Sequence, residues 1–128
     1  MRRLDVKKDE EIFLELIEEM KYHLILVEGK KDVKALKSLG LENIIAINGK
    51  PHIEILEKIY KYQKHPNFKE LSVVILTDFD TEGKKLASRF KLLFQKYHIK
   101  CNSRLRNKFM KFGKSTIEEF NKGWFEYD

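Results

Sequence analysis

The segment 72–76, which reads SVVIL, constrains the fold most because it leaves no polar face for water. A continuous, largely β-branched run is typical of a strand buried on both faces, as in a parallel sheet covered by helices. Asp78 and Asp80 follow this run at once, and Gly83 comes three residues after the second acid. Open α/β sheets hold their ligands beyond the carboxyl ends of their strands. Two carboxylates at such a place need a cation, which is either Mg²⁺ or a neighbouring lysine.

Three other segments are expected to be strands of the same sheet. Residues 23–27 form a second apolar run, and Glu28 and Gly29 follow it. Gly29 permits a tight turn after the expected strand. Residues 44–47 and 99–102 form two shorter runs, and the first of them leads into a turn that contains Gly49.

Apolar residues at helical spacing predict helices between and around these strands. The expected helices span residues 5–22, 33–39, 52–64, 82–97, 103–112 and 117–121. The first helix is interpreted as a cover for the sheet, with a dimer contact as the alternative. Asp32 and Ser103 are expected to cap the second and fifth helices.

The order of these elements predicts a single α/β domain over residues 1–128. Parallel strands joined by helices require right-handed crossovers, which place helices on both faces of the sheet. We expect four parallel strands in the order 2-1-3-4, counted along the chain. The core spans about residues 23–102, between an N-terminal helix and a C-terminal helical extension.

In this strand order the switch point of the sheet falls between Glu28 and Asp78, so Glu28, Asp78 and Asp80 are expected to converge. Such a set of carboxylates suits Mg²⁺, with Mn²⁺ as a substitute, and a bound metal can polarise a phosphoryl oxygen. Glu28 alternatively acts as a general acid or base. The simplest alternative is that Glu28 pairs with Lys30 or Lys31.

The net charge of +6 favours a polyanionic partner, nucleic acid first, although a charged surface also serves solubility. Basic side chains near the expected site or on the fifth helix are candidate phosphate contacts. They are Lys30, Lys31, Lys50, Lys84, Lys85, Arg89, Arg104 and Arg106. The fifth helix either docks on nucleic acid or covers the sheet, and the two roles are compatible.

Several protein classes are disfavoured. No apolar stretch approaches the roughly 20 residues of a membrane span, and the start lacks the apolar part of a secretory signal. Cys101 is the only cysteine, which excludes a disulfide framework within the chain, so we expect a cytoplasmic protein. A nucleotide phosphotransferase is disfavoured because the chain has no glycine-rich phosphate loop.

The segments LILVEGKKD, AINGK and VVILTDFDTEGKKLA together resemble the Toprim domain over about residues 24–102. The resemblance implies a Rossmann-like fold, Mg²⁺ held by acidic residues, and cleavage or rejoining of a nucleic-acid backbone. By position, Glu28 matches the general acid/base glutamate of the family. Asp78 and Asp80 match its metal-binding aspartates, and Gly83 matches its turn glycine.

Within that family the chain resembles small stand-alone archaeal proteins, and also the Toprim domains of the 5S ribosomal RNA maturation ribonuclease and of bacterial primases. The resemblance implies a Mg²⁺-dependent nuclease acting on RNA or DNA, a hydrolase with RNA processing as one role. The alternative is a non-catalytic nucleic-acid-binding or assembly subunit. A homodimer or larger complex is left open, through the first helix or an aromatic tail that contains Trp124, Phe125 and Tyr127.

Overall fold

The computed structural model describes residues 3–66 and 72–120. Within these residues a parallel sheet consists of β1 (Leu24–Val27), β2 (Ile44–Ala46) and β3 (Val73–Ile75), in the order β2-β1-β3. Ile25 of the central strand pairs with Ile44 on one side and with Val74 on the other. The structure therefore confirms a parallel α/β sheet in which the first and third strands are neighbours.

Both faces of the sheet are buried, as the apolar runs predict. Alternate residues of a strand point to opposite faces. Ile25 and Val74 contribute to one core cluster, whereas Leu24 and Val73 contribute to the other. All four side chains are at most 1% exposed. Neither face of these strands can accept a polar residue without a large desolvation cost.

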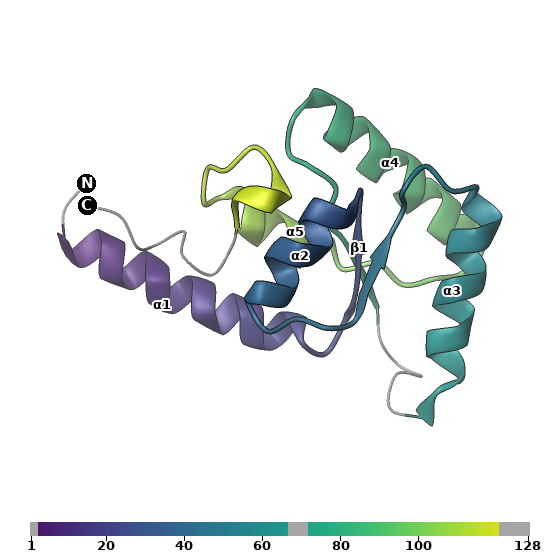
Figure 1. Ribbon diagram of the computed structural model, residues 1–128, viewed down its shortest axis with the longest axis horizontal. Helices are drawn as coiled ribbons and strands as arrows, with labels where there is room; N and C mark the ends of the chain where they lie inside the picture. Colours follow the sequence, from purple (N-terminus) through teal and green to yellow (C-terminus); the bar gives the residue numbers. More distant parts are fainter. Residues whose placement is uncertain (1–2, 67–71, 121–128) are drawn as a thin grey trace.

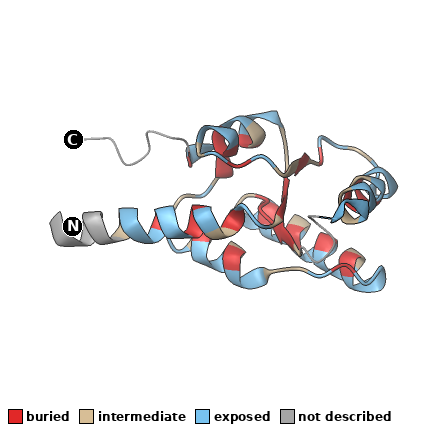
Figure 2. Cartoon of the chain, turned by 90° about the horizontal axis from the view of Figure 1, so that it is seen from below, coloured by how far each residue is buried: buried red, intermediate tan, exposed pale blue. Residues whose placement is uncertain are grey.

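Helices cover the two faces and make a three-layer arrangement. They are α1 (Arg3–Met20), α2 (Lys30–Ser38), α3 (His52–Lys64), α4 (Thr81–Lys96), α5 (Ser103–Met110) and the short 3₁₀ helix η2 (Ile117–Glu119). Figure 1 shows α1, α2 and α5 on one side of β1, and α3 and α4 on the other. Buried residues follow the inward faces of these helices, and exposed residues follow the outward faces (Figure 2).

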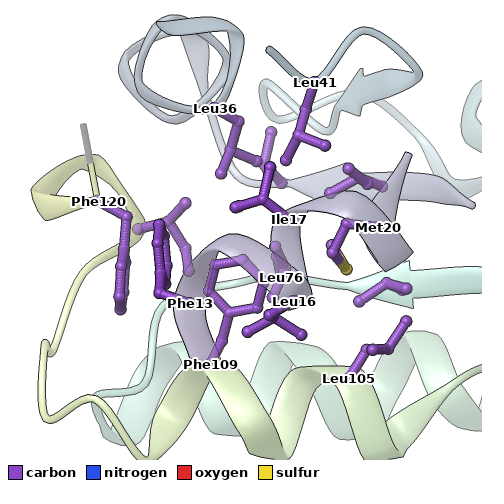
Figure 3. Packing of buried hydrophobic residues seen from close by; sticks show 14 of the residues in the cluster. Phe13, Leu16, Ile17, Met20, Leu36, Leu41, Leu76, Leu105, Phe109 and Phe120 are labelled. Carbon is purple, nitrogen blue, oxygen red and sulfur yellow. The ribbon is translucent and has the colours of Figure 1, made fainter. Parts of the chain in front are cut away.

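An aromatic cluster joins α1 to the C-terminal part of the described chain. Phe13 of α1 stacks on Phe120, and its ring also meets the edge of Phe109, with centroid distances of 5.7 Å in both pairs. Ile17 and Met20 extend the same buried stripe towards the sheet (Figure 3). Because these side chains are almost completely buried, the expected role of the first helix as a cover for the sheet is confirmed.

The prediction of a fourth strand at residues 99–102 is wrong. Only Cys101 bridges to Val73, and no continued ladder forms there in the described chain. The reason is that α5 begins at Ser103, so the backbone turns away after one bridge. Asn102 fixes this turn because its side-chain oxygen accepts a hydrogen bond from the Leu105 N–H at 3.1 Å. Asn102, and not Ser103, is therefore the N-cap of α5.

The start of α2 also differs from the prediction. The helix begins at Lys30, and Asp32 lies in its first turn instead of preceding it. Asp32 Oδ2 accepts a hydrogen bond from the Gly29 N–H at 3.0 Å, which stabilises the tight connection after β1. This connection places the whole first turn of α2 directly beside Glu28.

Two expectations concern the ends of the chain and membranes. The described helices include none that is both long and apolar enough to cross a membrane. The aromatic tail with Trp124, Phe125 and Tyr127 lies outside the described residues.

Candidate functional site

Two carboxylates from separate loops meet at the carboxyl end of the sheet. Glu28 directly follows β1, and Asp78 lies three residues beyond β3. Glu28 Oε2 accepts a hydrogen bond from the Asp78 N–H, and the two atoms are 2.7 Å apart. Because β2 lies on the far side of β1, this point is the switch point of the sheet, where open α/β sheets hold ligands.

The surroundings of Glu28 favour its protonated form. Burial raises the pKa of Glu28 above its ordinary value of 4.5, and the negative charges of Asp78 and Asp32 raise it further. The hydrogen bond from the Asp78 N–H lowers the pKa but does not cancel these effects. Glu28 therefore keeps a proton to a higher pH than an exposed glutamate, which suits a general acid or base.

An open depression of about 550 Å³ lies beside this pair. Its lining comes from four segments of the chain: Glu28, Gly29, Lys30, Lys31, Asp32, Asn48, Asp78, Thr116 and Glu118. Burial raises the pKa of Asp32, and the charges of Asp78 and Glu118 act in the same direction. Several acidic groups thus lie around one opening. Because their negative charges destabilise one another, a cation bound in the depression would be stabilised.

The sequence interpretation assigned no site role to Asp32, Asn48, Thr116 or Glu118. Asp32 was detectable in principle, because it lies one helical turn beyond the Glu-Gly pair that follows β1. Thr116 and Glu118 carry no such signal. They reach the depression only because η2 packs on α2, and no local pattern encodes that contact.

The C-terminal segment fixes the position of Asp78. Asp78 Oδ1 accepts a hydrogen bond from the Ile117 N–H at 2.8 Å. The neighbouring Phe79 N–H donates to the Ser115 carbonyl, also at 2.8 Å. The Asp78 carboxylate is therefore held by the first residue of η2, 39 positions away in the sequence.

Arg106, an expected nucleic-acid contact, is anchored in the fold by three hydrogen bonds to the backbone. Its Nη1 donates to the carbonyls of Ile75 and Thr77 at 3.1 and 2.7 Å, and its Nη2 donates to the Asp78 carbonyl at 3.1 Å. The guanidinium also lies 4.9 Å from the centroid of the Phe79 ring. Burial lowers the pKa of Arg106, whereas the charges of Glu28 and Asp78 raise it. The positive charge of Arg106 therefore interacts favourably with the negative charges of Glu28 and Asp78.

Asp80 directly precedes α4 and, in the described part of the chain, does not form a three-acid group with Glu28 and Asp78. Its exposed side chain is the N-cap of the helix, because Oδ1 accepts a hydrogen bond from the Gly83 N–H at 2.8 Å. Gly83 itself lies inside the first turn of α4 and not in a preceding turn. A Cβ at Gly83 would overlap the carbonyl group of Asp78, so this position requires glycine. Gly49, by contrast, occupies a true turn, with φ of +68°.

The predicted basic contacts fall into separate groups. Lys30 and Lys31 line the depression beside Glu28. Arg104 pairs with Glu19 of α1, so its charge has a partner in the fold. The other candidates lie outside this depression: Lys50, Lys84, Lys85 and Arg89.

The two converging carboxylates fit a metal that takes few protein ligands. Glu28 uses Oε2 for the Asp78 N–H and Asp78 uses Oδ1 for the Ile117 N–H, and the two carboxyl groups also lie close enough to hydrogen-bond to each other. Mg²⁺ commonly binds through one or two carboxylates and completes its shell with water and substrate phosphate. Within residues 3–66 and 72–120, no group of three or more His, Cys, Asp or Glu side chains is arranged to hold a metal ion.

Comparisons with known proteins agree on one family. A model of the Toprim domain matches residues 23–112. The chain is 34% identical over 122 residues to a UPF0292 protein of Methanocaldococcus jannaschii, which covers 89% of this chain and 90% of the relative. It is 30% identical to a UPF0292 protein of Methanosarcina acetivorans, over 91% of this chain and 78% of the relative. A solved structure of a protein from Aquifex aeolicus superposes with a TM-score of 0.70 at 29% identity, over 82% and 94% of the two chains.

The fold and the site together define an α/β protein with an acidic pair at the switch point of a parallel sheet. The chain belongs to the Toprim family, and its relatives include archaeal proteins of similar length. The resemblance seen in the sequence is therefore confirmed. Membership in this family links the chain to a metal-dependent function related to nucleic acids, and Toprim domains generally bind Mg²⁺.

Proposed function

We propose that this protein is a Mg²⁺-dependent nuclease that cleaves the phosphodiester backbone of RNA or DNA. The observation that carries the proposal is the Glu28–Asp78 pair, which lies at the switch point and opens into a depression lined by Lys30 and Lys31. Acids and bases of this kind at the carboxyl end of a parallel sheet are arranged for a ligand that carries both a metal and phosphates.

Each residue of the proposed site has a distinct task. Glu28 transfers a proton, because its raised pKa keeps it closer to the protonation equilibrium at neutral pH than an exposed acid. Asp78 holds a fixed position through the Ile117 N–H and lines the depression as a metal ligand. Glu28 and Asp78 would hold Mg²⁺, and the chemistry that the metal would supply is polarisation of a phosphoryl oxygen. Lys30 and Lys31 contact backbone phosphates without reading sequence, so binding weakens as salt rises.

A cleavage assay with end-labelled single- and double-stranded RNA and DNA tests the proposal. We expect cleavage with Mg²⁺ or Mn²⁺ and none with a chelator. Glu28→Gln and Asp78→Asn should each lower the rate by about 10²–10⁴, the usual contribution of a positioned acid or base. Glu82→Gln is the matched control, because Glu82 is exposed on α4 and its substitution should change nothing. Cleavage that survives Glu28→Gln and Asp78→Asn would exclude this pair from the mechanism.

A second candidate function is a non-catalytic nucleic-acid-binding or assembly subunit of a processing complex. The position of Asp80 favours it, because that carboxylate caps α4 and does not complete a three-acid site. This alternative predicts salt-dependent binding of RNA or DNA with no turnover on any of the four substrates. It also predicts that Glu28→Gln leaves the affinity for nucleic acid unchanged in the presence of a chelator.

A further inference from the structure

A second cavity, distinct from the acidic depression, lies between α4 and α5 beside β3. Its volume is about 270 Å³. Its lining residues from the strand, the two helices and the chain before α5 are Ile75, Lys84, Ala87, Ser88, Lys91, Cys101, Asn102, Ser103, Arg106, Asn107 and Met110. We call this cavity the α4–α5 pocket. Its floor is the outer edge of β3, where the expected fourth strand does not form.

That edge has hydrogen-bonding groups that the rest of the described chain satisfies only in part. Val73 is paired, because its N–H donates to the Lys100 carbonyl and its carbonyl accepts from the Asn102 N–H. The carbonyl of Ile75 accepts from Arg106. The Ile75 N–H, which points to the same open edge, donates to no described residue. A buried backbone donor of this kind requires an acceptor, from water or from a ligand.

The charge of the pocket has one sign. Lys84, Lys91 and Arg106 line it, and none of its lining residues is acidic. Arg106 has five N–H donors and uses three hydrogen bonds to anchor the backbone, so part of its donor capacity is still available. Ser88 and Asn107 add neutral polar groups. Donors and cations without acids select an anion, and they suit phosphate oxygens in particular.

A partner strand is a poorer occupant of this edge. A strand that extends a sheet needs both donors and acceptors along the edge. Arg106 already occupies the carbonyls of Ile75 and Thr77, so a partner strand would find one N–H and no acceptor beside it. The outer edge of β3 can therefore donate a hydrogen bond to a ligand acceptor, but it does not suit a partner strand.

We infer that the α4–α5 pocket binds a phosphate group of the nucleic-acid strand next to the one at the Glu28–Asp78 pair. The inference rests on the proposed function for the origin of the phosphate. Arg106 connects the two places, because it lines the pocket while its Nη2 lies 3.1 Å from the Asp78 carbonyl. A strand held at both points is fixed in direction across the acidic pair.

Cys101 offers a direct readout, because it lines the pocket and is the only cysteine of the chain. We would measure the rate of alkylation by iodoacetamide, a neutral reagent, at a pH of about 9 and with a chelator present. Inorganic phosphate, a nucleoside 5′-monophosphate and a short oligonucleotide are each added in turn. A probe at ten times its Kd should slow the reaction about tenfold, whereas the matching nucleoside should have no effect. The oligonucleotide separates a strand from a free nucleotide as the source of phosphate.

Variants connect the protection to the pocket. Lys91→Glu should raise the Kd of the phosphate probes about tenfold, as expected for loss of one charge-assisted contact, and so weaken their protection of Cys101. Lys96→Glu, an exposed lysine on the same helix but outside the lining, should leave it unchanged. Glu28→Gln should abolish cleavage but keep the protection, so failure of the proposed nuclease activity is distinguishable from failure of this inference. The inference is overturned if no phosphate-bearing probe protects Cys101, or if protection is the same in Lys91→Glu as in the wild type. Its link to a nucleic-acid strand is overturned if only the mononucleotide protects.

Discussion

Glu28 and Asp78 are 50 residues apart in the sequence, yet the carboxylate of one accepts a hydrogen bond from the backbone N–H of the other at 2.7 Å. The contact exists because β1 and β3 are parallel neighbours, so the loops that follow them emerge side by side. It also creates a conflict, since burial of Glu28 beside Asp78 and Asp32 disfavours its charged form. Residues with perturbed pKa values are common at functional sites, where a group needed for the reaction can lower the stability of the fold.

The first prediction concerns the stability cost of Glu28. Its raised pKa means that the folded state holds the proton more tightly than the unfolded chain. The associated stability is present below pH 4.5, the ordinary pKa, and is lost as pH rises through the raised pKa. Glu28→Gln keeps an oxygen for the Asp78 N–H and removes the charge. We expect this variant to be more stable than the wild type at pH 7, by about 0.5–1 kcal/mol.

Chemical unfolding of both proteins at pH 4 and pH 7 checks this prediction. The stability difference between variant and wild type should be larger at pH 7 than at pH 4, because the raised pKa of Glu28 makes the wild type lose stability relative to the variant as the pH rises. A difference that is the same at both pH values would show that the folded state does not perturb Glu28.

The second prediction separates two roles of Asp80. As an N-cap, Asp80 can be replaced by asparagine with little loss, whereas Asp80→Ala should destabilise the protein by about 1 kcal/mol. If Asp80 is also a metal ligand, Asp80→Asn should lower Mg²⁺-dependent cleavage while the thermal midpoint stays constant. Full cleavage by Asp80→Asn would limit Asp80 to its role at the start of α4.

The third prediction compares two glycines near the candidate site, Gly83 in the first turn of α4 and Gly29 directly before α2. Gly83→Ala would force a Cβ into the Asp78 carbonyl, so the loop or α4 must shift, at a cost of about 1–3 kcal/mol. Gly29→Ala should cost less than about 1 kcal/mol, because its Cβ would lie 3.7 Å from Asn48 Oδ1, an ordinary contact. Urea unfolding of the two variants measures the difference. Equal losses would contradict the close approach of α4 to Asp78.

The fourth prediction concerns two arginines of α5. Arg106→Ala removes three hydrogen bonds from a charged group to buried carbonyls, and we expect a loss of about 2–4 kcal/mol. Arg104→Ala removes an exposed ion pair with Glu19 and should cost no more than about 1 kcal/mol. Arg106→Lys should recover only part of the loss, because an ammonium group cannot reproduce the planar fork. Unfolding midpoints in denaturant rank the three variants, and similar losses at both positions would refute the anchoring role.

Local patterns predicted the elements whose physics is local. The continuous apolar runs identified β1, β2 and β3, because strands buried on both faces cannot carry polar residues. The helices were predicted in order, and their ends shifted by up to three residues where side chains such as Asp32 form hydrogen bonds outside the expected cap position. The parallel direction of the strands followed from the lengths of the connections, and the expected central position of β1 is confirmed.

The failures share one physical cause. A fourth strand was expected at residues 99–102, but Arg106 and the start of α5 compete for the same edge of β3. Asp80 was expected beside the other acids, but the free N–H groups at the start of α4 compete for its carboxylate. In both cases the structure differs from the prediction because these groups form hydrogen bonds that the sequence pattern does not indicate.

The sequence by itself determined the strands, their parallel direction and the two acids that follow β1 and β3, because burial and chain connectivity fix these features. Only the tertiary structure decided which acids meet, which arginine becomes an anchor and how η2 comes to hold Asp78. These outcomes depend on the direction of single side chains over a few ångströms. Hydrophobic periodicity contains no information on the direction of a single side chain. It therefore predicts where a site lies but not which side chains meet there.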